Sequence, residues 1–125
     1  TLEVRFARMC GNAQALAQRH AEHRKVDAVS YPGLPSHPAH ALAKAQMASF
    51  GALIGVTLAD KGAAERFIDA CGFIRSATSF GGVHTSAERR ARWGDQVAEG
   101  FIRLSVGCEP TEVLWAEIER ALSDV

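Results

Sequence analysis

The segment from Ser79 to His84 and the arginine at position 103 carry the side chains best suited to bind an anion. The segment contains the pair Gly81-Gly82, and a glycine lets a ligand approach backbone N–H groups closely. The guanidinium of Arg103 presents a planar fork of donors that fits a carboxylate in a bidentate way. These residues predict an anion receptor. The alternative is a simple turn at the glycine pair with a solvated or salt-bridged Arg103.

Four histidines raise the question of a metal site, because imidazoles are common zinc ligands. His37 and His40 flank Pro38, and His20 and His23 lie upstream. No cysteine or carboxylate completes a local ligand set, and loop polarity and capping explain the histidines. We therefore predict no metal site.

Cys10, Cys71 and Cys108 are an odd number of cysteines at wide spacings, without a Cys-x-x-Cys pair. This usage favours a reducing cytoplasm. Cys108 could act as a nucleophile only with a base beside it, and a buried structural thiol is the favoured interpretation.

The composition, with 47% hydrophobic and 22% charged residues in 125, fits one globular domain. Fourteen basic and fourteen acidic residues cancel, and no run of Lys and Arg exceeds the short group Arg89-Arg90-x-Arg92, so nucleic-acid binding is not expected. We interpret that group as solvated arginines on an amphipathic helix rather than as a phosphate site. No apolar stretch approaches the ~20 residues of a membrane span, and no signal-peptide pattern opens the chain.

The apolar periodicity and the glycines and prolines predict the order of helices and strands. We expect helices over 2–23, 38–47, 63–71 and 111–122, and strands over 26–30, 51–58, 73–76 and 101–106. The polar segment 86–98 is expected to hold only one or two turns. In the last strand Arg103 points away from Ile102 and Leu104. The order predicts an α/β sandwich in which helices cover one face of a mostly antiparallel sheet.

Four blocks of the sequence, which together extend over nearly the whole chain, resemble one enzyme family in order and spacing. The blocks are Tyr31-Pro32-Gly33-Leu34-x-Ser36-His37-Pro38, Gln46-Met47-x-x-Phe50-Gly51, Ser79-x-Gly81-Gly82 and Ile102-Arg103-Leu104-Ser105-Val106-Gly107-x-Glu109. They resemble the C-terminal part of the pyridoxal-phosphate (PLP) enzymes of trans-sulfuration. Cystathionine γ-lyase, cystathionine γ-synthase and methionine γ-lyase are members of this family.

The resemblance implies a fold-type I protomer, in which residues 1–125 form the small C-terminal domain and the large PLP-binding domain is absent. The first helix is already in its apolar pattern at Leu2, which favours a helix that continues from that larger domain. The resemblance also implies a cytoplasmic homo-oligomer, usually a tetramer, that acts on cystathionine or a related amino acid.

By the same resemblance, Arg103 and Ser79 match the positions that hold the substrate's α-carboxylate, and Gly81, Gly82 and His84 complete the expected substrate site. His84-Thr85 stands where many relatives have Glu-Ser, which affects charge preference near the distal end of the substrate.

The three lysines, Lys25, Lys44 and Lys61, lie in no Ser-x-Thr-Lys context. We therefore expect no catalytic or cofactor-binding residue in residues 1–125, and an inactive isolated chain.

The favoured function is substrate binding in a cystathionine γ-lyase-like enzyme that catalyses γ-elimination or γ-replacement. Cystathionine γ-synthase and methionine γ-lyase are alternatives within the family, and a free-standing α/β binding or interaction module is an alternative outside it. An exposed apolar sheet face would favour the enzyme, and a closed polar surface would favour the module.

Overall fold

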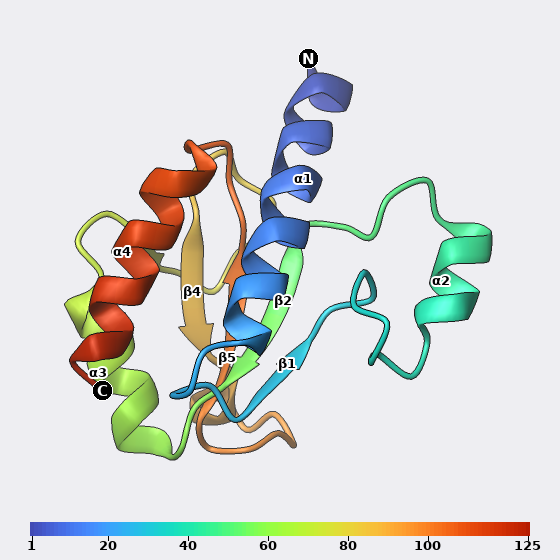
Figure 1. Cartoon of the computed structure of the whole chain (residues 1–125). Helices are drawn as coiled ribbons and strands as arrows, with labels where there is room; N and C mark the ends of the chain where they lie inside the picture. The colour runs from blue at the N-terminus through green and yellow to red at the C-terminus, as the bar shows by residue number, and fades with distance from the viewer.

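The protein is described by a computed structural model that covers residues 1–125 and contains four α-helices, a 3₁₀ helix and a five-stranded sheet (Figure 1). In chain order the elements are α1 (Leu2–Ala21), β1 (Ala28–Ser30), α2 (His40–Gln46), β2 (Leu53–Thr57), α3 (Lys61–Ala70), β3 (Arg75–Ser76), β4 (Ser86–Arg89), η1 (Arg90–Trp93), β5 (Phe101–Ser105) and α4 (Thr111–Ser123). The predicted α/β class is confirmed. None of the helices combines the length and apolarity that a membrane crossing needs.

The sheet has the strand order β1-β2-β5-β4-β3 and is antiparallel except between β3 and β4, which run parallel. The predicted mostly antiparallel sheet is therefore correct. β5 lies in the middle because both β2 and β4 pair with it. A side chain on β5 is thus surrounded by neighbours from two strands.

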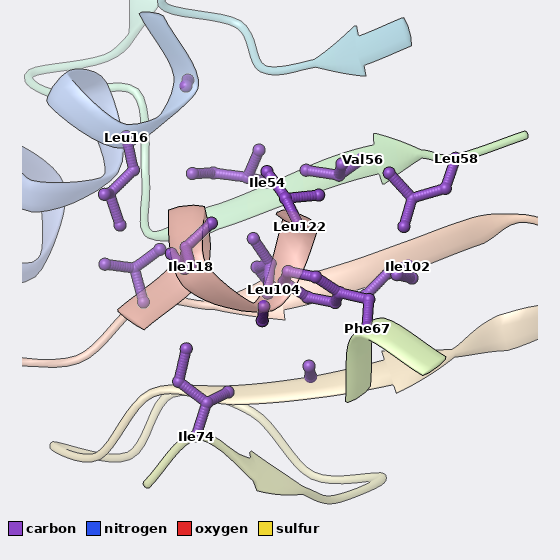
Figure 2. Packing of buried hydrophobic residues seen from close by; sticks show 14 of the residues in the cluster. Leu16, Ile54, Val56, Leu58, Phe67, Ile74, Ile102, Leu104, Ile118 and Leu122 are labelled. Carbon is purple, nitrogen blue, oxygen red and sulfur yellow. The ribbon is translucent and has the colours of Figure 1, made fainter. Parts of the chain in front are cut away.

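The hydrophobic core lies between one face of the sheet and helices α1, α3 and α4 (Figures 1 and 2). Alternate residues of β2 and β5 meet the helices there, and the core includes Leu16, Ile54, Val56, Phe67, Ile102, Leu104, Ile118 and Leu122. Burying a side chain of this size contributes roughly 1.5–3 kcal/mol. Helix α2 lies apart from the sheet, and only its Ala43 is buried (Figure 1).

The second face of the sheet, opposite these helices, carries the other alternate residues. Gly55 pairs with Arg103, and Arg103 pairs with Glu88 on the next strand, so the three side-chain positions form a row on this face. The ring of Phe101 covers Gly55, where an added Cβ would lie 2.6 Å from a ring carbon. Arg103 is half-buried in this row.

The prediction for residues 86–98 was wrong in its first part, because Ser86–Arg89 forms strand β4, whereas the 3₁₀ helix η1 over Arg90–Trp93 agrees with the expected turn. Arg89 on β4 is buried and forms ion pairs with Glu65 on α3, at 3.6 Å, and with Glu99, at 2.8 Å. It is therefore not the solvated arginine that the sequence predicted. The polar sequence does not indicate burial here, because the carboxylates that pair with Arg89, those of Glu65 and Glu99, lie elsewhere in the chain.

Candidate anion-binding site

Arg103, at the centre of β5, is held by the loop that follows β3. Its Nη2 donates a hydrogen bond to the carbonyl oxygen of Thr78 at 2.6 Å, and its Cζ lies 5.0 Å from the centre of the Phe80 ring. Its Nε and Nη1 atoms have no hydrogen-bond partner in the chain. One corner of the guanidinium is thus fixed, and the rest of its donor fork is free for an anion.

Glu88 is the nearest carboxylate to consider as a partner for Arg103, since the two residues pair in the β4–β5 register. Its Oε1 instead accepts a hydrogen bond from the indole N–H of Trp93 at 2.6 Å and lies 3.7 Å from Arg92. Arg103 forms no salt bridge with any carboxylate of the chain. Its positive charge is therefore not neutralised internally.

The Ser79–His84 loop is anchored to both sides of the end of β5. The backbone N–H of Gly81 donates to Oγ of Ser105 at 2.8 Å, and the carbonyl of Val83 accepts from the N–H of Cys108 at 2.8 Å. Gly81 has φ of +90°, a left-handed conformation that favours glycine. The hydrogen bond from Gly81 therefore holds the loop against the strand that carries Arg103.

A buried network behind the loop explains two residues of the last sequence block. The carboxylate of Glu109 accepts hydrogen bonds from Thr85, from its N–H at 2.9 Å and from its hydroxyl at 2.8 Å. The N–H of Gly107 donates to the Thr85 hydroxyl at 2.9 Å. A Cβ added at Gly107 would lie 2.3 Å from the Val83 carbonyl. Gly107 and Glu109 thus position the loop.

Ser79, Gly82 and His84 line a pocket of about 200 Å³ together with Arg75 of β3. The structure therefore gathers three of the predicted site residues, and it places Arg103 against Thr78 and Phe80, the neighbours of Ser79 in the chain. The sequence reasoning missed Arg75. Its alternation with the buried Ile74 in a predicted strand was the available signal.

Gly81, the remaining predicted residue, lines a larger pocket of about 540 Å³ on the other side of Phe80. This pocket is mostly apolar, and its wall includes Leu2, Arg5, Phe6, Met9, Phe50 and Leu53. Leu2 is 71% exposed and Phe80 is 61% exposed. The candidate anion-binding residues thus lie beside an exposed apolar surface that the start of α1 helps to form.

Each of the four histidines considered for a metal site has a separate structural contact. His37 accepts from the N–H of Ala39, His40 is bonded to the Pro32 carbonyl, and His20 and His23 lie edge-on to the ring of Trp115. No group of three or more histidine, cysteine, aspartate or glutamate side chains gathers in a way that could hold a metal ion.

The three cysteines are unpaired. Cys108 is half-buried rather than buried as predicted, and its Sγ lies 3.7 Å from the Arg5 carbonyl and is hydrogen-bonded to no imidazole. Burial raises the pKa of the Cys71 thiol to about 12, which keeps that thiol protonated at neutral pH.

A sequence model of the family described as Cys/Met metabolism PLP-dependent enzymes matches residues 1–123. A putative cystathionine gamma-lyase from Streptomyces coelicolor is 44% identical over 125 residues, which are 99% of this chain and 32% of that protein. A cystathionine beta-lyase from Coxiella burnetii is 41% identical over 134 residues, covering 98% of this chain and 35% of that protein. The chain therefore spans about a third of the length of the curated relatives that it matches.

Solved structures agree with the sequence comparison. The crystal structure of metB from Corynebacterium glutamicum superimposes with a TM-score of 0.92 at 35% identity, over 97% of this chain and 34% of that one. CalE6, a methionine gamma lyase from Micromonospora echinospora, gives a TM-score of 0.90 at 39% identity, over 96% of this chain and 33% of that one.

Proposed function

The chain belongs to the Cys/Met metabolism family of PLP-dependent enzymes, and on that premise we propose that residues 1–125 bind the α-carboxylate of a sulfur amino acid. One observation carries the proposal: the half-buried guanidinium of Arg103 is held at Thr78 and Phe80, has no carboxylate partner and keeps two nitrogens free. Free N–H groups on a guanidinium form strong, charge-assisted hydrogen bonds with a carboxylate.

Arg103 and the hydroxyl of Ser79, which follows Thr78 in the chain, would orient the amino acid rather than react with it. Fixing the carboxylate positions the rest of the substrate, and such positioning lowers the barrier of the later steps. His84, Gly81 and Gly82 would shape the space around the substrate, with the glycines admitting it close to the backbone.

The cofactor would come from outside these residues. Lys25, Lys44 and Lys61 line neither pocket beside the loop, so none of them is placed to carry PLP at this site. When bound, PLP supplies the electron sink of the reaction. Residues 1–125 would supply substrate binding only, and we expect the isolated chain to be inactive.

We propose that residues 1–125 are the small C-terminal domain and that the large PLP domain covers the 540 Å³ pocket. The apolar residues around it support this, since Leu2, Phe6 and Phe80 are 71%, 41% and 61% exposed. The Streptomyces coelicolor relative is about three times as long as the part of it that this chain matches, so that relative has residues enough for such a domain. The exposed apolar surface favours a part of an enzyme over a free-standing module. We expect the whole enzyme to be a cytoplasmic homo-oligomer.

Within the family we favour a cystathionine γ-lyase-like activity, because the relative described above with 44% identity carries that name. The test uses the full-length, PLP-loaded protein and L-cystathionine. Cleavage at the γ-carbon releases cysteine, 2-oxobutanoate and ammonia, whereas cleavage at the β-carbon releases homocysteine, pyruvate and ammonia. We expect the first set. The second set would identify a β-lyase, and the release of neither thiol nor oxo acid would contradict the lyase proposal.

A further inference from the structure

We propose that Asn12, a buried residue of helix α1, positions the Ser79–His84 loop and thereby the side chains that bind the substrate. Asn12 lines neither of the two pockets beside the loop, so its effect on the substrate is indirect. It acts through residues 107–109, which are hydrogen-bonded both to α1 and to the loop. The inference rests on the proposed function of the loop and adds a positioning residue to it.

Asn12 is a polar residue on the buried side of α1. It is 1% exposed, and the residues that follow it on the same side of the helix, Ala13, Leu16 and Ala17, belong to the hydrophobic core. A buried amide destabilises a protein unless its donors and acceptor find partners, and an apolar side chain of the same size avoids that cost. The identity of this residue therefore depends on what its amide binds.

The amide of Asn12 binds the segment that follows β5. Its Nδ2 donates to the carbonyl oxygen of Gly107 at 3.0 Å and to that of Glu109 at 2.8 Å. Its Oδ1 accepts from the hydroxyl of Thr111, the first residue of α4. Both amide hydrogens are thus used on two carbonyls of one short segment, which fixes residues 107–109 relative to α1.

The same segment holds the loop through its other groups. The N–H of Cys108 donates to the Val83 carbonyl at 2.8 Å, and the N–H of Gly107 donates to the Thr85 hydroxyl at 2.9 Å. The carbonyl of Gly107 and the N–H of Cys108 belong to one planar peptide group. This peptide group is therefore bonded to α1 at one edge and to the loop at the other, so a shift of α1 is passed on to the loop.

The start of α1 gives this connection a further consequence. Phe6 and Met9, which precede Asn12 by one to two turns, line the pocket of about 540 Å³ that the large PLP domain would cover. Contact with that domain would set the position of α1, and Asn12 would carry that position to the loop. The substrate-binding loop is then placed with respect to the cofactor domain, although it belongs to the small domain.

The experiment compares Asn12→Leu with the wild-type full-length enzyme loaded with PLP. Leucine has nearly the same size as asparagine but no donors. We expect the KM for L-cystathionine to rise about tenfold with a smaller change in kcat, because the loop is displaced while the reacting groups are not. We also expect the backbone N–H groups of residues 79–85 to exchange faster with deuterium, as read by mass spectrometry.

Gln14→Met is the matched control. Gln14 is another amide of α1 that donates to a backbone carbonyl, that of Gly33, at 3.0 Å. Methionine removes this donor while keeping the size of the side chain, and Gly33 has no hydrogen bond to the Ser79–His84 loop. The control should therefore leave both KM and the exchange of residues 79–85 unchanged.

A double variant tests the route. Thr85→Val removes the hydroxyl that links the loop to Gly107 and Glu109. If Asn12 acts through these residues, Asn12→Leu and Thr85→Val together should raise KM about as much as the more damaging of the two alone. Fully additive losses would show that Asn12 does not act through residues 107–109.

Two results would overturn the positioning role. One is a folded Asn12→Leu enzyme with wild-type KM, when Arg103→Ala has raised KM. The other is exchange that rises equally throughout residues 1–125. If Asn12→Leu does not fold, as judged by circular dichroism, Asn12→Ser replaces it with the same expected changes, since one hydroxyl cannot donate to both carbonyls. If Arg103→Ala leaves KM unchanged, the α-carboxylate role fails, whereas the exchange of residues 79–85 still decides whether Asn12 positions the loop.

Discussion

Glu88 lies directly opposite Arg103 in the β4–β5 ladder, but its carboxylate is bonded to the indole N–H of Trp93. Opposite charges in such a cross-strand pair would ordinarily attract each other. Glu88 is buried, with its side chain 3% exposed, so the bond from Trp93 satisfies an acceptor that would otherwise seek another donor. Trp93 thereby keeps Arg103 available to a ligand.

Trp93→Phe should weaken substrate binding by releasing Glu88. Without the indole N–H, the Glu88 carboxylate keeps Arg92 at 3.7 Å and is free to pair with the Arg103 guanidinium opposite it, and that ion pair would compete with the substrate. We expect KM to rise about fivefold with a smaller change in kcat, as measured on the full-length enzyme.

Two further variants distinguish this effect from a general loss of packing. Adding Glu88→Gln to Trp93→Phe should restore much of the affinity, because an amide carries no charge to neutralise Arg103. Trp115→Phe, which alters a tryptophan that packs on His20, should leave KM unchanged. An unaltered KM in Trp93→Phe would show that Trp93 does not control Arg103.

Gly107→Ala should displace the Ser79–His84 loop. The new Cβ would lie 2.3 Å from the Val83 carbonyl and 2.7 Å from the Thr85 nitrogen, so the backbone must move. We expect a loss of about 1–3 kcal/mol in the free energy of unfolding, together with weaker substrate binding. Urea unfolding measures the first effect and KM measures the second.

Gly11→Ala provides the control for that loss, since a Cβ added at Gly11 in helix α1 meets nothing within 4 Å. Replacing a helical glycine by alanine should stabilise the protein slightly. Equal stability of Gly107→Ala and the wild type would mean that the loop does not depend on close approach at this position.

His20 should make the fold sensitive to mild acid. Burial lowers the pKa of its imidazole from 6.5 to about 4, with a hydrogen bond to the Leu16 carbonyl opposing the shift. The unfolded chain therefore binds a proton between pH 6.5 and 4 that the folded chain does not. The contribution of His20 to the free energy of unfolding is complete above pH 6.5. As the pH falls towards 4, this contribution decreases by about 3 kcal/mol.

Urea unfolding across this pH range, compared between wild type and His20→Leu, tests the assignment. The variant should lose most of the acid-dependent change. His23→Gln, which alters the other imidazole against Trp115, should keep it. The same pH dependence in wild type and His20→Leu would point to other groups.

The sequence predicts best those helices and strands that bury one face, because their apolar residues then recur at a regular spacing. The apolar spacing gave α1 and α4 within about two residues at each end, and the alternation around Arg103 gave β5 and the direction of that side chain. Both helices bury one long stripe of residues, which on α4 consists of Leu114, Ile118, Ala121 and Leu122.

Strand β4 could not be predicted in this way, because two of its buried residues are charged. Glu88 and Arg89 are satisfied by Trp93, Glu65 and Glu99, and only the fold brings the last two to Arg89. A hydropathy pattern marks such residues as exposed, so it does not predict a strand in this segment.

The pocket of Arg75 was missed for a related reason. β3 has only two residues, too short for an alternating pattern to stand out, and its parallel pairing with β4 is not visible in local sequence. The loop from Ser79 to His84 was predicted, but the two arginines on either side of it come from strands 28 positions apart in the chain, Arg75 and Arg103.

The most direct test of the account is the substrate affinity of Arg103→Ala in the full-length, PLP-loaded enzyme. We predict a tenfold to hundredfold weaker affinity, about 1.5–3 kcal/mol, for both L-cystathionine and L-methionine. Arg103→Lys should recover only part of it, because an ammonium cannot bind a carboxylate in a bidentate fork. A correctly folded Arg103→Ala enzyme with wild-type affinity for both amino acids would contradict the carboxylate role of this site.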